Sequence, residues 1–254
     1  MQFRPCIDLH NGKVKQIVGS TLREDDPDSL RTNFIAEHPS SWFARLYQQD
    51  NLTGGHIIKL GPGNDEAATE ALAAWPGGMQ IGGGITAENG KEWLDKGASH
   101  VIVTSYVFRD GTIDHRCLQK LVQAVGKEHL VLDLSCRKKG EDYYIVTDRW
   151  QKFTDVIVCA RVLAEFAAHC DEFLIHAADV EGQCNGIEKE LVQKLADWSP
   201  IPTTYAGGVK DIKDFELIRG LGRNRLHATV GSALDIFGGS TMTYAEAVAF
   251  HRKG

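Results

Sequence analysis

One composite pattern occurs twice along the chain, in the same order each time: a glycine pair, a helix-like segment, a short apolar run and a small hydroxyl residue. The first copy contains Gly83, Gly84, Thr104 and Ser105, and the second contains Gly207, Gly208, Gly231 and Ser232. The copies are separated by about half of the 254 residues, and so are Asp8 and Asp133, each of which stands between two apolar residues. A fixed period of this kind indicates an internal repeat. We therefore expect two similar halves.

Short apolar runs alternate with amphipathic, helix-like segments along the whole sequence. Strands are predicted over residues 3–9, 56–60, 79–81, 101–104, 130–134, 172–176, 203–205 and 228–230. Helices are predicted over residues 41–49, 65–75, 88–96, 117–125, 156–169, 189–198, 211–220 and 243–252. Continuous apolar strands alternating with helices favour a parallel sheet, and eight such units favour a closed barrel over an open sheet.

The domain organisation follows from the same alternation. No linker rich in glycine, proline or serine and no run of like charges divides the chain, so we predict one domain over residues 1–254. Barrels of this length commonly form a single domain. The predicted fold class is α/β, a single (β/α)8 TIM barrel built from two similar (β/α)4 half-barrels.

Composition excludes several classes of function. A net charge of −6 and the absence of a long Lys/Arg run argue against nucleic-acid binding. No apolar stretch approaches the roughly 18 residues of a membrane span, and the N-terminus has no secretory pattern. We expect a cytoplasmic monomer, although removal of a transit peptide stays open.

The cysteine and histidine positions give no indication of a metal site. None of the six cysteines forms a Cys-x-x-Cys pair, and an enzyme-sized chain without a secretory pattern is expected to keep its thiols reduced. Because the histidines and cysteines also lack metal-ligand spacing, we predict no bound metal.

Two long connections follow the first strand of each half, at residues 19–34 and 137–151. They are either surface decoration or flaps that close over a substrate, since long loops in compact domains are often functional. Residues 142–148 within the second connection are expected to form a local hairpin.

The repeated glycines and hydroxyls predict a site at the C-terminal ends of the strands, where barrel active sites lie. Glycine lets the backbone turn its N–H groups inward, a helix N-terminus adds positive charge, and a hydroxyl adds a donor. These are the components of a phosphate site without lysine. Two such sites, formed by the eight residues named first, predict a substrate with a phosphate at each end.

Asp8 and Asp133 end the first and fifth predicted strands, so in a closed barrel they face each other across the mouth. Each carboxylate could instead cap a loop or pair with a nearby base, such as Lys13 or Lys138. As a symmetric pair between two phosphate sites they favour acid–base catalysis, with one carboxyl as base and the other as proton donor.

Several segments carry a resemblance to a known family. They read PCIDLHNGKVKQIVGS, IGGGI, LDLS, YAGGV and VGSALD. Taken together over essentially the whole chain, they resemble the phosphoribosylformimino-aminoimidazole carboxamide ribotide (ProFAR) isomerases of histidine biosynthesis, in their eukaryotic form. The resemblance implies a barrel of the ribulose-phosphate-binding type and an Amadori rearrangement, without cofactor, of a bisphosphorylated aminoaldose to the aminoketose PRFAR. It also implies that Asp8 is the base and Asp133 the acid.

One position departs from the family pattern. Many bacterial relatives place a catalytic threonine before an acidic residue at the end of strand six, where this chain has Ala178 before Asp179. The role of the missing hydroxyl must fall to another group, and His176, Asp179 or a water are the candidates. We therefore expect His176 and Asp179 as possible substrate contacts.

Two other functions compete with the isomerase. The cyclase subunit of imidazole glycerol phosphate synthase resembles the same half-barrel pattern and also uses two aspartates, but it needs ammonia from a glutaminase partner. A catalytically silent barrel that binds phosphorylated ligands is the other alternative, and the presence of both Asp8 and Asp133 argues against it.

Overall fold

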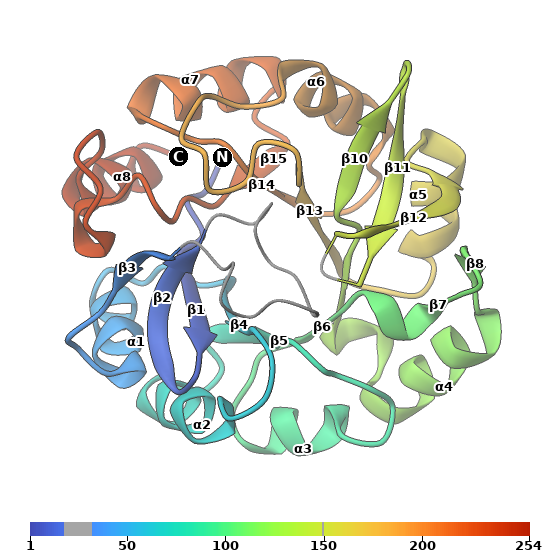
Figure 1. The fold of residues 1–254 in the computed structure, drawn as a ribbon, viewed down its shortest axis with the longest axis horizontal. Coiled ribbons are helices and arrows are strands. Elements are labelled where there is room, and N and C mark those ends of the chain that lie inside the picture. The colour runs from blue at the N-terminus through green and yellow to red at the C-terminus, as the bar shows by residue number, and fades with distance from the viewer. Residues whose placement is uncertain (18–31, 149) are drawn as a thin grey trace.

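A computed structural model describes residues 1–17, 32–148 and 150–254 of the chain. Its centre is a ring of parallel strands, into which Figure 1 looks, with the helices outside. The barrel strands are β1 (Cys6–His10), β4 (Gly55–Lys59), β5 (Met79–Gly82), β6 (Val101–Val103), β9 (Leu130–Asp133), β13 (Glu172–His176), β14 (Thr203–Ala206) and β15 (Leu226–Ala228).

Each barrel strand pairs in parallel with the next along the chain, from β1 with β4 to β14 with β15. The ring closes because Phe3 forms a parallel bridge with Ala228, and the backbone N–H of Arg4 donates to the Ala228 carbonyl at 2.9 Å. The prediction of a closed barrel with eight parallel strands is confirmed.

The helices form the outer layer, and each overlaps a segment that the alternation predicts as helical. They are α1 (Ser40–Gln49), α2 (Asp65–Ala74), α3 (Gly90–Asp95), α4 (His115–Val125), α5 (Ala160–Ala167), α6 (Lys189–Trp198), α7 (Ile212–Leu221) and α8 (Tyr244–Arg252). In α4 the buried residues Leu118, Leu121 and Val125 recur at the three- and four-residue spacing that faces one side of a helix. The Asp114 side chain caps the same helix by accepting from two backbone N–H groups. Among the described residues, no helix has the length and apolar character needed to cross a bilayer.

Antiparallel excursions leave the barrel after the first and the fifth strand, so the two halves share this feature as well. After β1 come β2 (Lys13–Ile17) and β3 (Thr32–Ile35), which extend the sheet from β1. After β9 come β10 (Cys136–Lys139), β11 (Asp142–Thr147) and β12 (Lys152–Ile157), which form a separate three-stranded sheet. Of the predicted connection at 19–34, residues 19–31 lie outside the described residues.

The second excursion corrects two expectations. Residues 142–148 do not form a hairpin by themselves, because residues 142–147 are the single strand β11. The helix expected to begin at residue 156 begins at Ala160 instead. Val156 and Ile157 belong to β12, which pairs with β11, so sheet pairing overrides the helical pattern there.

The barrel interior has an apolar layer and a buried polar group. Ile102, Val131, Leu174 and Ala206, from four different strands, form a small apolar cluster. The polar group centres on Glu172, which begins β13 and forms a buried ion pair with Arg4. Thr204 also donates to the Glu172 carboxylate at 2.9 Å, and Gln80 donates to its other oxygen at 3.4 Å. This carboxylate on β13 therefore connects to β14, to β5 and to the segment just before β1.

Removal of the Glu172 carboxylate should be costly, because it leaves the Arg4 guanidinium buried without its counter-ion. We expect Glu172→Ala to lower the free energy of unfolding by about 3–5 kcal/mol, measured by denaturant titration. Asp95→Ala is the control, since Asp95 pairs with Lys91 on the exposed surface of α3. That variant should stay within about 0.5 kcal/mol of the parent. Equal losses in both variants would contradict the role assigned to the buried pair.

Candidate active site

The C-terminal ends of the barrel strands surround a cavity of about 640 Å³. A second, smaller cavity of about 40 Å³ adjoins it. Four residues line both cavities: Asp8, Gln16, His176 and Glu181. These four side chains therefore mark the place where the two cavities meet.

The residues predicted to bind phosphate divide between the two cavities, one copy of the repeat in each. The large cavity is lined by Gly83, Gly84, Thr104 and Ser105. The small cavity is lined by Gly207, Gly208, Gly231 and Ser232. The geometry brings together the members of each copy and separates the two copies across the barrel mouth.

The paired glycines have matching backbone conformations. Gly83 and Gly84 have φ angles of 94° and 70°, and Gly207 and Gly208 have φ angles of 118° and 73°. These lie in the left-handed region that favours glycine. A side chain is also excluded by space, since a Cβ on Gly83 would lie 2.1 Å from the Lys59 carbonyl oxygen. The repeat seen in the sequence is thus a repeat of backbone geometry.

Each excursion contacts the hydroxyl of one copy. The backbone N–H of Asp148, just after β11, donates to Ser105 Oγ at 3.3 Å. Ser232 Oγ donates to Gln16 Oε1, on β2, at 3.4 Å. Both serines therefore lie between a barrel strand and the excursion that follows the first or fifth strand.

Asp8 lies on β1, where burial and a neighbouring carboxylate act against its ionisation. Gln16 Nε2 donates to Asp8 Oδ2 at 3.0 Å. Burial and, secondarily, the negative charge of Glu181 raise the pKa of Asp8 to about 7. A carboxyl with this pKa can accept a proton near neutral pH more readily than an ordinary one.

Asp133 ends β9 and has a different environment. The backbone N–H of Ser135 donates to Asp133 Oδ1 at 2.9 Å, and the Ser135 hydroxyl donates to the same oxygen at 2.7 Å. Burial acts to raise the pKa of Asp133, but the charge of His176 and the hydrogen bonds from His176 and Ser135 outweigh it and hold the pKa below its ordinary value. Asp133 is therefore ionised at neutral pH.

His176 ends β13 and contacts Asp133 directly, with 3.4 Å between its Nδ1 and Asp133 Oδ1. Burial acts to lower the pKa of His176, but the charge and hydrogen bond of Asp133, together with Glu181 and Asp8, raise it to about 9. The ring of Trp150 lies 5.7 Å from the His176 ring and also lines the large cavity. The residue at the end of strand six is thus a protonated imidazole, two positions before Ala178.

Asp179 lies outside both cavities. Its carboxylate accepts from Arg137 Nε at 2.7 Å and from the Lys138 backbone N–H at 2.9 Å. The alternative that Asp133 pairs with Lys138 is not what the structure has, because the Lys138 ammonium binds Glu190 at 2.6 Å.

Glu181 is the acidic group that sequence reasoning missed. It lies in the loop after β13, lines both cavities and has a raised pKa caused by burial, which outweighs the opposing charge of His176. It has no counterpart in the repeat, so comparison of the two halves could not find it. Its one sequence indication is its place in the segment that follows the sixth strand, close to Asp179.

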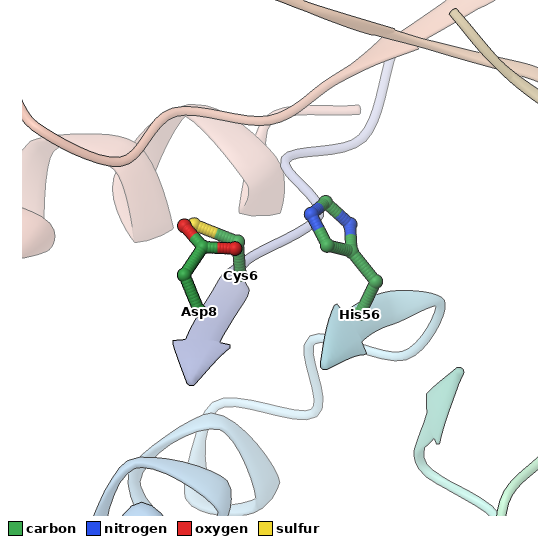
Figure 2. Close-up of side chains that lie close together, drawn as sticks. All are labelled: Cys6, Asp8 and His56. Atoms are coloured by element: carbon green, nitrogen blue, oxygen red, sulfur yellow. The ribbon is translucent and has the colours of Figure 1, made fainter. Parts of the chain in front are cut away.

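Cys6, Asp8 and His56 lie together in the barrel interior, as Figure 2 shows. Their potential metal-ligand atoms all lie within 4.8 Å of one another. Burial and the positive charge of His176 lower the pKa of His56 to about 3, so its imidazole is neutral. Sequence spacing could not indicate this group, because its members come from two strands that are far apart in the chain.

Comparison with known proteins gives a consistent result. A sequence profile of the family described as "Histidine biosynthesis protein" matches residues 2–240. The chloroplastic 1-(5-phosphoribosyl)-5-((5-phosphoribosylamino)methylideneamino)imidazole-4-carboxamide isomerase of Medicago truncatula is 55% identical over 258 residues, covering 100% of this chain and 82% of the relative. Proteins of the same isomerase name are 50% identical in Yarrowia lipolytica and 45% identical in Saccharomyces cerevisiae, each covering 99% of this chain and 98% of the relative.

The raised pKa of Asp8 makes stability depend on pH. In the unfolded chain this carboxyl titrates near 3.8, and in the folded chain near about 7, so between these values the folded state binds more protons. The free energy of unfolding therefore falls as pH rises through that window. Asp8→Asn removes this pH dependence. From a pH below the window to a pH above it, we expect the free energy of unfolding of the variant to rise relative to that of the parent by up to about 4 kcal/mol. Denaturant titrations at several pH values measure this, and parallel curves would contradict it.

Proposed function

Because the chain belongs to the histidine biosynthesis protein family, we propose that it is an aldose–ketose isomerase that converts the aminoaldose ProFAR to the aminoketose PRFAR in histidine biosynthesis. The observation that carries this proposal is the similarity to proteins of that isomerase name over nearly the whole chain. The matched region includes both copies of the repeat and all the residues that line the two cavities.

The arrangement of the two cavities supports a substrate with a phosphate at each end. One copy of the glycine and hydroxyl set lies in the large cavity and the other in the small cavity. Asp8 and His176 lie where the cavities meet. A substrate bound by both sets would therefore pass its central atoms between these two side chains.

The chemistry requires one proton donor and one proton acceptor. Protonation of the ring oxygen lets the bond from that oxygen to C1′ break, which opens the ring to a Schiff base. Removal of the C2′ proton then gives an enolamine, which tautomerises to the aminoketose. The protons taken and given balance, so the chain's own titratable side chains are sufficient.

Two carboxyls, Asp8 and Glu181, lie at the meeting point of the cavities. We assign the base to Asp8, because its pKa lies near neutrality and the family resemblance implies this role for it. The role of Asp133 as the acid stays a prediction, and its low pKa makes it a poor donor by itself. We propose that Asp133 acts through His176, which carries the proton and lines both cavities. Asp133 is then the residue that positions the imidazole and keeps it protonated.

The two competing functions lack such a positive observation. The cyclase alternative requires ammonia, and conversion of ProFAR by the purified chain without ammonia or glutamine separates the two activities. A silent phosphate-binding barrel has no need for paired proton donors and acceptors between its phosphate sites.

A monomeric state and a cytoplasmic location are also proposals. All six cysteines are free, which supports a reducing compartment. The name of the Medicago truncatula relative includes "chloroplastic", so relatives differ in how their location is described.

Asp8→Asn tests the proposed base. We expect turnover of ProFAR to fall by about 10²–10⁴-fold while the substrate still binds, because the amide keeps the shape of the carboxyl and cannot accept the C2′ proton. Turnover and calorimetric binding measured on the same preparation check this. Asp95→Asn, at an exposed carboxyl on α3, is the matched control and should keep the parent's rate. An Asp8→Asn variant with unchanged turnover would exclude Asp8 as the base.

The pH profile tests the proposed acid. Since Asp8 must be deprotonated and His176 protonated, kcat/KM should rise with pH through about 7 and fall above about 9. His176→Gln should lower kcat/KM and abolish the alkaline fall. Glu181→Gln is the comparison, because Glu181 lines the same cavities and should not set the alkaline limb. If kcat/KM of His176→Gln still fell at alkaline pH and that of Glu181→Gln did not, Glu181 and not His176 would be the acid.

A further inference from the structure

The group formed by Cys6, Asp8 and His56 is built by the register of the barrel. Cys6 and Asp8 are two residues apart on β1, so their side chains leave the strand on the same face. Cys6 is the direct partner of His56 in the parallel pairing of β1 with β4. The register therefore brings a thiol, a carboxylate and an imidazole together inside the barrel, as Figure 2 shows.

The spacing of the ligand atoms suits a small cation. Bonds of roughly 2.0–2.3 Å from a tetrahedral Zn²⁺ place two ligand atoms about 3.5 Å apart. The three ligand atoms here lie within 4.8 Å of one another. Binding therefore requires the three side chains to rotate toward one another, and the Gln16 amide, which donates to Asp8 Oδ2 at 3.0 Å and to Cys6 Sγ at 3.9 Å, has to give up its contact with the sulfur. The small cavity, which all three residues line, has room for a water as the fourth ligand.

The imidazole of His56 is the second indication of a ligand. His56 is 3% exposed and lines the small cavity. Among the described residues no protein group hydrogen-bonds to its ring nitrogens, and these nitrogens are not among the fully buried atoms that lack a partner, so they are open to the small cavity. A buried polar group normally has a hydrogen-bond partner, and here the partner must come from the cavity. A bound cation supplies the missing partner.

The charges around the group are mixed, so the donor atoms and not the net charge decide which ion suits it. The carboxylates of Asp8, Asp133 and Glu181 line the cavities, whereas the positive charges of His176 and Arg4 act on His56. A thiolate with an imidazole selects soft divalent ions such as Zn²⁺ and Cd²⁺, whereas Mg²⁺ and Ca²⁺ prefer sites made of oxygen atoms.

We propose that Cys6, Asp8 and His56 form a site for a thiophilic divalent cation, with Zn²⁺ as the natural ion. We also propose that occupation of this site inhibits the isomerase activity. The ion replaces the thiol proton of Cys6, which passes to solvent, and it bonds to the Cys6 sulfur, one Asp8 oxygen and one His56 nitrogen. The bound ion withdraws Asp8 from proton transfer. The inhibition rests on the proposed isomerase function, whereas the binding does not.

Cd²⁺ is the probe for binding, because a Cd²⁺–thiolate bond gives a charge-transfer absorption in the ultraviolet. The full-length, reduced protein, freed of metal by a chelator, is titrated with Cd²⁺ while absorption and heat are recorded. We expect one Cd²⁺ per chain. Cys6→Ser should lose the absorption and bind at least about tenfold more weakly, and His56→Gln should also bind at least about tenfold more weakly.

Two other cysteines provide matched controls. Cys184 lines the same small cavity, and Cys117 lies on α4 outside both cavities. Cys184→Ser and Cys117→Ser should keep the parent's absorption and affinity. The site would be overturned if Cys6→Ser kept the absorption of the parent. It would also be overturned if the folded parent bound no Cd²⁺. Circular dichroism confirms that each variant is folded, and His56→Gln gives an independent result if Cys6→Ser is not.

Inhibition is measured separately, with Zn²⁺ added to the ProFAR assay. We expect Zn²⁺ to compete with ProFAR in the parent, and the concentration that halves turnover to rise at least about tenfold in His56→Gln. Full turnover with the site occupied would overturn the inhibition and leave the binding intact. A parent without isomerase activity would overturn the proposed function, and the Cd²⁺ titration would still decide the site.

Discussion

Closure of the barrel between its first and last strands is the constraint on which the site depends. The backbone around Phe3 pairs with Ala228 at the end of β15, through hydrogen bonds of 2.9 and 3.0 Å. That pairing brings β1, which carries Asp8, beside the loop that carries Gly231 and Ser232. In an open sheet these segments would lie at opposite edges, and the small cavity would have only one of its walls.

The two aspartates show how one repeated sequence element acquires two electrostatic roles. Asp8 and Asp133 occupy equivalent places in the two halves, but Asp8 accepts one hydrogen bond from neutral Gln16, whereas Asp133 accepts two from Ser135 and contacts protonated His176. Burial therefore dominates the pKa of Asp8, and charge and hydrogen bonding dominate that of Asp133. Groups with separated pKa values can share acid and base work.

The sequence was sufficient to predict the eight barrel strands, the closed barrel and the division of the glycine and hydroxyl sets, because all of these follow from periodicity and repeat. The last strand was predicted too late, at residues 228–230, whereas β15 is Leu226–Ala228, and β2, β3, β10 and β12 of the excursions were not predicted. The sequence was insufficient for Glu181, Gln16 and the contact of His176 with Asp133, since these depend on which side chains the closed ring brings together across elements. It also placed a helix start at residue 156, where pairing of β12 with β11 prevails over local pattern. Ala178, the position that departs from the strand-six threonine of the bacterial relatives, lies two residues beyond the end of β13 at His176.

The central claim is that the two glycine and hydroxyl sets hold the two ends of one substrate with residue 8 between them. A crystal structure of the Asp8→Asn variant with ProFAR bound tests it most directly. We expect one phosphate against Gly83, Gly84 and Ser105, the other against Gly207, Gly208 and Ser232, and C2′ next to residue 8. Density that places both phosphates in one cavity, or C2′ out of reach of residue 8, would contradict it.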